Sequence, residues 1–97
     1  MICINKVFSY KGASARVVVE TSNDVICREI LEILKSEDFS RALKLIRSHG
    51  GCKILSEDPL RVASRDEQIT LTLEPVNLLA RLGWEIVVDK AREYCSY

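Results

Sequence analysis

Apolar and polar residues alternate with a period of two at the start of the chain. Ile2, Ile4 and Phe8 put apolar side chains on one face of an extended segment, and the run ARVVVE at residues 15–20 predicts a second strand. A short loop containing Gly12 separates the two segments, and glycine readily adopts the positive φ that tight turns need. The first twenty residues therefore predict a β-hairpin.

The next segment changes to helical spacing. Its apolar residues fall at i, i+4, i+7 and i+8, on one face of a helix over residues 22–35: Ile26, Ile30, Ile33 and Leu34. Thr21 and Asp24 have the spacing of a capping box, which predicts that they begin this helix. A second helix is predicted over residues 38–48, with four apolar residues facing inward: Phe39, Ala42, Leu43 and Ile46.

The period of two returns in the second half of the chain. Residues 53–55 and 60–63 predict two short strands, separated by a turn at Asp58-Pro59. Ile69, Leu71 and Leu73 alternate with threonines, which is the clearest strand pattern in the sequence. Residues 60–73 therefore predict a hairpin with one face in water.

The last third of the sequence predicts a short helix followed by a strand. Pro75 suits the first turn of a helix, and Val76, Leu79 and Leu82 form an apolar stripe after it, with Leu78 beside them. Gly83 permits the left-handed conformation that ends a helix. Residues 86–88 (IVV) are β-branched and predict the final strand.

These segments predict one α+β domain over residues 1–97. The element order is β-β-α-α-β-β-β-α-β, which favours a single mostly antiparallel sheet with helices packed on one face. The core is expected to contain mainly the aliphatic residues of the periodic segments, together with one tryptophan: Ile4, Val17, Val19, Ile26, Ile30, Leu34, Leu43, Ile46, Ile69, Leu71, Leu79, Leu82, Trp84 and Val87.

The composition narrows the classes of function. The formal net charge is zero, which argues against nucleic-acid binding through bulk charge. The sequence has no apolar run long enough to cross a membrane and no leader pattern at its start, so we expect a cytoplasmic protein without a membrane partner. The single glutamine and the many charged residues lean toward a thermophile.

The four cysteines do not have the spacing of a metal or redox motif. They stand at positions 3, 27, 52 and 95, so no C-x-x-C pair exists, and we expect neither a metal nor a cofactor. The simplest expectation is that they are buried thiols. A disulfide between Cys3 and Cys95 is the alternative if the terminal strands are neighbours, since intracellular disulfides occur in hyperthermophiles.

Charge is unevenly distributed along the chain. Residues 40–54 carry Arg41, Lys44, Arg47 and Lys53 and no acid, whereas residues 21–39 carry five acids and two bases. The first three of these cations recur every three residues on one face of the second predicted helix. That face is a candidate anion or nucleic-acid site, with the hairpin of residues 60–73 acting as a wing. The alternative is a solvated helix face that pairs with the acids of the first helix.

One short segment of the sequence contains residue types that occur together in catalytic sites. His49 lies three residues before Cys52, with two glycines between them, and a Cys–His pair can form a reactive thiolate. The competing interpretation is that His49 and the glycines end the second helix. We therefore expect no enzymatic activity, and rank a cysteine-dependent enzyme at Cys52 third among the alternatives.

The function that these features favour is a small protein-interaction or regulatory module. The edge strands of such a sheet need covering, so we expect a homodimer or another protein partner. A nucleic-acid-binding protein that uses Arg41, Lys44 and Arg47 is the second alternative.

Overall fold

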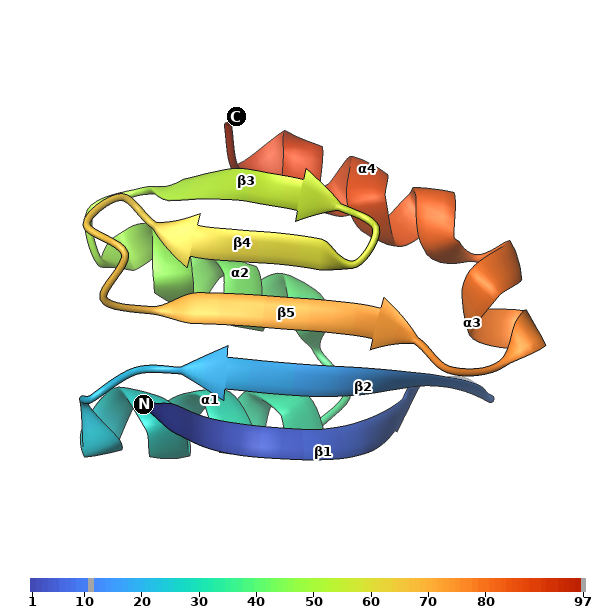
Figure 1. Cartoon of the computed structure of the whole chain (residues 1–97), viewed down its shortest axis with the longest axis horizontal. Coiled ribbons are helices and arrows are strands. Elements are labelled where there is room, and N and C mark those ends of the chain that lie inside the picture. The colour runs from blue at the N-terminus through green and yellow to red at the C-terminus, as the bar shows by residue number, and fades with distance from the viewer. Residues whose placement is uncertain (11, 97) are drawn as a thin grey trace.

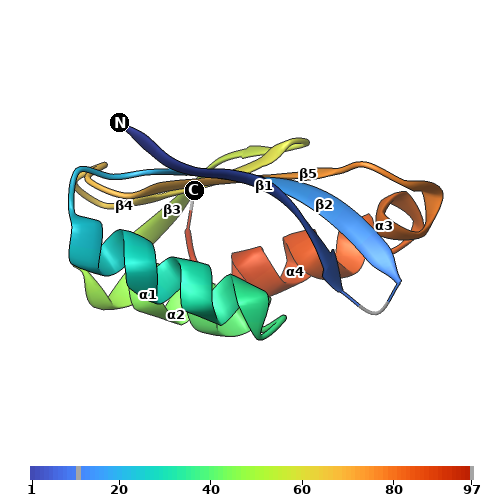
Figure 2. The same cartoon turned by 90° about the horizontal axis from the view of Figure 1, so that it is seen from below.

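A five-stranded antiparallel sheet, with helices packed against one of its faces, confirms the predicted α+β class. The computed structural model describes residues 1–10 and 12–96, so Lys11 of the predicted hairpin loop lies outside the described residues. The elements are β1 (Ile2–Tyr10), β2 (Ala13–Glu20), α1 (Asp24–Lys35), α2 (Phe39–Ser48), β3 (Cys52–Glu57), β4 (Leu60–Ser64), β5 (Thr70–Pro75), α3 (Leu78–Leu82) and α4 (Trp84–Tyr94). Figure 1 views the sheet face-on, and Figure 2 shows α1, α2 and α4 on the same side of it.

The strand order is β1-β2-β5-β4-β3, which makes β1 and β3 the two edge strands. The hairpins β1–β2 and β4–β5 are both present, as the alternating patterns predicted. Between them β2 pairs with β5, so that Val17 stands opposite Leu73 and Val19 opposite Leu71. These four side chains are buried beneath the helices, which places the core on the covered face of the sheet.

The predicted capping box at the start of α1 is wrong. The N-cap is Asn23, whose Oδ1 accepts hydrogen bonds from the backbone N–H groups of Val25 and Ile26. The Thr21 hydroxyl instead accepts from the Asn23 N–H at 3.2 Å and is part of a buried residue. Asparagine caps a helix as well as threonine does, so the start of the helix moves by only two residues.

The predicted final strand is also wrong, because residues 84–94 form helix α4. Gly83 has φ −90°, so it does not adopt the left-handed conformation, and it links α3 to α4 directly. Trp84, Val88 and Ala91 are buried at i, i+4 and i+7 of α4. Packing of this face against the sheet outweighs the strand preference of the β-branched run at residues 86–88.

The buried residues match most of the predicted core, including Trp84, whose indole N–H donates to the backbone oxygen of Glu57 at 3.1 Å. The exceptions lie in α3 and in the first turn of α4. Leu79 and Leu82 are 59% and 73% exposed, and Val87 is only half-buried. Helix α3 has five residues and contributes only Ala80 to the buried set, so the stripe predicted to face inward lies in solvent.

Two disulfides replace the expected buried thiols and the expected Cys3–Cys95 bond. Cys3 of β1 is bonded to Cys27 of α1, with a Cα–Cα distance of 6.4 Å. Cys52 of β3 is bonded to Cys95, with a Cα–Cα distance of 4.9 Å. Because β1 and β3 lie at opposite edges of the sheet, Cys3 and Cys95 are too far apart to pair.

The β4–β5 turn depends on the fully buried hydroxyl of Ser64. This Oγ donates to Asp66 Oδ1 at 2.8 Å and accepts from the backbone N–H of Ile69 at 3.1 Å. The hydrogen bond from Ser64, together with one from the Gln68 N–H, lowers the pKa of Asp66. The turn is therefore most stable when Asp66 carries its charge.

We expect Ser64→Ala to lower the free energy of unfolding by about 1–3 kcal/mol, because it leaves the buried Ile69 N–H without an acceptor. A carboxyl whose pKa is lowered by folding adds stability above its ordinary pKa, and this contribution is lost as pH falls through the folded value. Part of the difference from wild type should therefore disappear in acid. Urea unfolding at neutral and acid pH measures both effects, and equal stability of the two proteins at neutral pH would contradict them.

Candidate functional site

The three cations of α2 that were predicted as an anion or nucleic-acid site have different neighbours in the structure. Arg41 lies 4.0 Å from Asp38, the N-cap of the same helix. The Lys44 ammonium lies over the ring of Tyr94, 5.6 Å from its centroid. Only Arg47, in the last turn, faces a cavity. The predicted site is therefore divided among three different environments.

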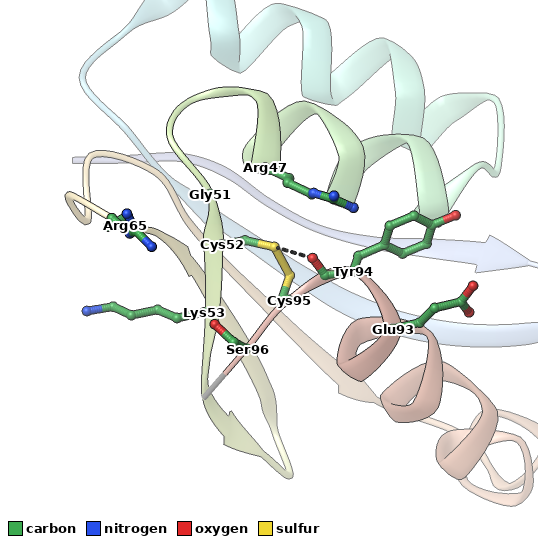
Figure 3. A pocket seen from close by; sticks show the side chains of 9 residues that line it. All are labelled: Arg47, Gly51, Cys52, Lys53, Arg65, Glu93, Tyr94, Cys95 and Ser96. Atoms are coloured by element: carbon green, nitrogen blue, oxygen red, sulfur yellow. Dashed lines mark hydrogen bonds between the residues drawn. A yellow bond between two sulfur atoms is a disulfide. The ribbon is translucent and has the colours of Figure 1, made fainter.

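A cavity of about 500 Å³ opens where α2, β3 and the end of α4 meet. We call it the Arg47–Arg65 cavity; its charged and hydroxyl-bearing lining residues are Arg47, Lys53, Arg65, Glu93, Tyr94 and Ser96. Figure 3 shows the Cys52–Cys95 disulfide between Arg47 on one side and Lys53 and Arg65 on the other. Two of the four residues predicted as an anion site thus line one cavity, and Arg41 and Lys44 do not.

Arg65 is a member of this cavity that the sequence reasoning missed. It follows β4, and its backbone N–H donates to the oxygen of Gly51 at 3.2 Å, which holds it beside the start of β3. Its position depends on the pairing of β3 with β4, so the sequence pattern alone carried no signal for it. Of the three cations, Lys53 has a partner: its Nζ lies 2.7 Å from Glu67 and lowers the pKa of that carboxyl.

The chain after α4 forms the remaining wall of the cavity. Ser96 pairs with the outer edge of β3, accepting from the Ile54 N–H at 2.6 Å and donating its own N–H to Cys52 at 3.2 Å. The Cys52–Cys95 bond fixes this arrangement covalently. The result is that β3 has a partner on part of its edge, whereas the edge of β1 has none within residues 1–10 and 12–96.

The same disulfide bears on the Cys–His hypothesis. Cys52 is bonded to Cys95 and carries no thiol in this structure. His49 is exposed at the C-cap of α2, where its N–H donates to Ile46. Gly50 and Gly51 follow with φ of 103° and 108°, which is the helix-ending geometry that the competing interpretation expected.

An exposed apolar surface lies at the other end of the molecule, on and around α3. We call it the α3–α4 surface; it consists of Val76, Leu78, Leu79, Leu82 and Ile86, which are between 45% and 73% exposed. Ten large apolar side chains are exposed among the described residues, and half of them lie within these eleven consecutive positions. Such clustering differs from the scattered apolar residues of an ordinary surface.

The α3–α4 surface continues into a groove of about 360 Å³ on the helix side of the sheet. Leu79 and Ile86 line both features. Residues of the α1–α2 connection and of α4 line the groove, and its apolar lining includes Phe8, Leu34, Phe39, Leu73 and Trp84. The groove and the surface together form one apolar region.

Among the described residues, no group of three or more His, Cys, Asp or Glu side chains is arranged to hold a metal ion. In the same part of the chain, no helix has the length and apolar character needed to span a membrane. The chain matched no protein-family model, no curated protein and no solved structure.

Proposed function

We propose that this chain is a non-enzymatic protein-interaction module that forms a homodimer through the α3–α4 surface. The observation that carries the proposal is the concentration of exposed apolar residues there, led by Leu78 at 72%, Leu82 at 73% and Ile86 at 69% exposure. Leaving these side chains in water forfeits roughly 1.5–3 kcal/mol for each one that a partner would bury fully. Association provides that burial.

The size of the surface suits one half of a dimer interface. Side chains with these exposed fractions present on the order of 500 Å² of apolar area, near the upper end for a monomer. A standard interface buries about 800 Å² on each partner. The α3–α4 surface therefore supplies an apolar centre, with room for a polar rim around it.

The charges around the surface favour a second copy as the partner. Arg81, Glu85 and Lys90 are exposed on α3 and α4 and carry both signs. In an isologous dimer each patch faces its own copy, so a rim of mixed sign can pair with itself. A rim of one sign would instead have favoured a partner of the opposite charge.

We expect Leu82→Glu to weaken dimerisation at least about thirtyfold, the factor that corresponds to an interface hot spot. The substitution puts a carboxylate at the centre of the interface in both copies, and the 73% exposure of Leu82 lets the monomer fold unchanged. Sedimentation equilibrium measures the result. Wild type should have twice the 11.0 kDa chain mass, and the variant should have the single-chain mass.

Val25→Glu is the matched control. Val25 is 56% exposed in the first turn of α1, remote from α3 (Figure 2), so the same change of character should leave the dimer intact. A wild-type mass of 11.0 kDa at high concentration would overturn the proposal. Equal weakening by both variants would also overturn it.

We further infer a cytoplasmic setting in a thermophile. The single glutamine and the many charged residues support a thermophile, and inside the cells of a hyperthermophile the two disulfides can persist, although disulfides are otherwise rare in the cytosol. A thermal midpoint of about 45–65 °C, typical of mesophilic domains, would contradict this setting.

A further inference from the structure

The Arg47–Arg65 cavity has an excess of positive charge in a chain whose formal net charge is zero. We propose that it binds a phosphorylated, hydroxyl-bearing small molecule, whose phosphoryl group is attracted by the positive charges of Arg47 and Arg65 on either side of the Cys52–Cys95 bond (Figure 3). This activity is separate from the proposed dimer, because the cavity lies beside β3 and the end of α4, away from α3.

The first observation in support of this proposal is the balance of charges that line the cavity. Among the described residues, three cations and one carboxylate, that of Glu93, line the cavity. Neither Arg47 nor Arg65 forms an ion pair with any described residue, whereas Lys53 is paired with Glu67. Cations that gather around one hollow repel each other and concentrate anions there. Guanidinium groups also match the geometry of phosphate oxygens.

The shape of the cavity favours a small molecule over a nucleic acid. Its volume of about 500 Å³ is in the range of small-ligand sites. The other cations of α2 are engaged outside it, Arg41 by Asp38 and Lys44 by the Tyr94 ring. Arg41 and Lys44 do not line the cavity, so a ligand held inside it would not contact them.

The rest of the lining suits a ligand larger than phosphate itself. Glu93 can accept a hydrogen bond from a ligand hydroxyl, and the Ser96 hydroxyl can donate or accept one. The half-buried Tyr94 adds an aromatic side chain to the same wall. A sugar phosphate presents this combination of one anionic group and several hydroxyls.

The test is titration of the oxidised protein with ribose 5-phosphate at constant ionic strength, followed by amide chemical shifts. We expect saturable shifts at Gly51, Lys53, Arg65 and Ser96. Inorganic phosphate should bind the same residues more weakly, and ribose should not bind. The proposal would be overturned if neither ribose 5-phosphate nor inorganic phosphate gave saturable shifts. It would also be overturned if sulfate at the same ionic strength gave shifts equal to those of ribose 5-phosphate.

Substitutions of exposed arginines test which side chains bind the ligand. Arg47→Gln and Arg65→Gln should each weaken the binding of ribose 5-phosphate at least about tenfold, because each removes one of the positive charges that attract the phosphoryl group. Arg41→Gln is the matched control, on the same helix but outside the cavity, and should leave the affinity unchanged. Equal affinity of Arg47→Gln and Arg41→Gln would contradict the assignment.

The last binding experiment uses a single-stranded oligonucleotide as the probe. Binding of the oligonucleotide that is lost in Arg47→Gln, with no response to ribose 5-phosphate, would overturn the small-molecule proposal in favour of nucleic acid. Failure of the oligonucleotide to bind, together with saturable ribose 5-phosphate binding, would support it.

Discussion

Replacing Ile30 by alanine is expected to lower the free energy of unfolding by about 2–5 kcal/mol. Ile30 is fully buried on α1, in the same core cluster as Val19 and Leu71 of the sheet, so the substitution leaves a cavity there. Leu71→Ala, at a position that is 1% exposed on β5, should cost a similar amount. Urea denaturation of the oxidised protein measures both.

Val25→Ala is the control for these substitutions. Val25 lies on the same helix as Ile30 but is 56% exposed, so truncation should change the stability by less than about 0.5 kcal/mol. If Ile30→Ala or Leu71→Ala unfolds at the same urea concentration as wild type, the assignment of this sheet face as the core fails.

Removal of the Cys52–Cys95 bond should be comparably costly. The bond closes a loop with a sequence separation of 43, and such a crosslink restricts the unfolded chain enough to stabilise the fold by about 4 kcal/mol. The Cys52→Ser/Cys95→Ser double variant should lose this stability. It should also release the backbone hydrogen bonds of Ser96 to β3, which amide hydrogen exchange at Ile54 can detect.

The Cys3→Ser/Cys27→Ser variant separates the two crosslinks. The Cys3–Cys27 bond joins β1 to α1 and has a sequence separation of 24, so its removal should lower the free energy of unfolding by about 3.5 kcal/mol. The protection of the Ile54 amide from hydrogen exchange should stay unchanged. Titration of free thiols in the untreated wild-type protein is the prior check. Four titratable thiols, with stability unaffected by a reducing agent, would contradict the presence of both bonds.

The sequence predicted those elements whose periodicity and burial agree. In α1, Ile26, Ile30 and Leu34 are all buried as the helical spacing predicted. In β5, Leu71 and Leu73 face the core, whereas Thr70 and Thr72, which alternate with them, are half-buried on the other face. In both segments local preference and tertiary packing point in the same direction, so the pattern was sufficient.

The end of the chain was not predictable in this way, because local preference and packing disagree there. The run Ile86-Val87-Val88 favours a strand, yet Val88 shares a helix face with Trp84 and Ala91, and only the sheet beneath them decides between the two. A separate error assigned Leu79 and Leu82 to the core, because the short helix was predicted correctly but its apolar stripe faces solvent. Their exposure on α3 is the observation on which the proposed dimer depends.

The cysteine pairing and the cavity needed the strand order. Four cysteines allow three pairings, and spacing alone does not choose among them. The order β1-β2-β5-β4-β3 puts Cys3 at one edge of the sheet and Cys52, with its partner Cys95, at the other. A Cys3–Cys95 bond is therefore excluded. The same order brings Arg65 beside Lys53, although twelve positions separate them in sequence. The basic spacing of α2 identified Arg47 but gave no sign of this third cation.

The most direct test of the proposed self-association is an isotope-filtered NOE experiment on a mixture of labelled and unlabelled protein, which detects only contacts between chains. We expect NOEs from the methyl groups of Leu78, Leu82 and Ile86 to the same region of the partner, because these side chains form the exposed apolar centre. Contacts between chains confined to Ile2 and Val7 would instead indicate pairing along the open edge of β1, and would contradict the account.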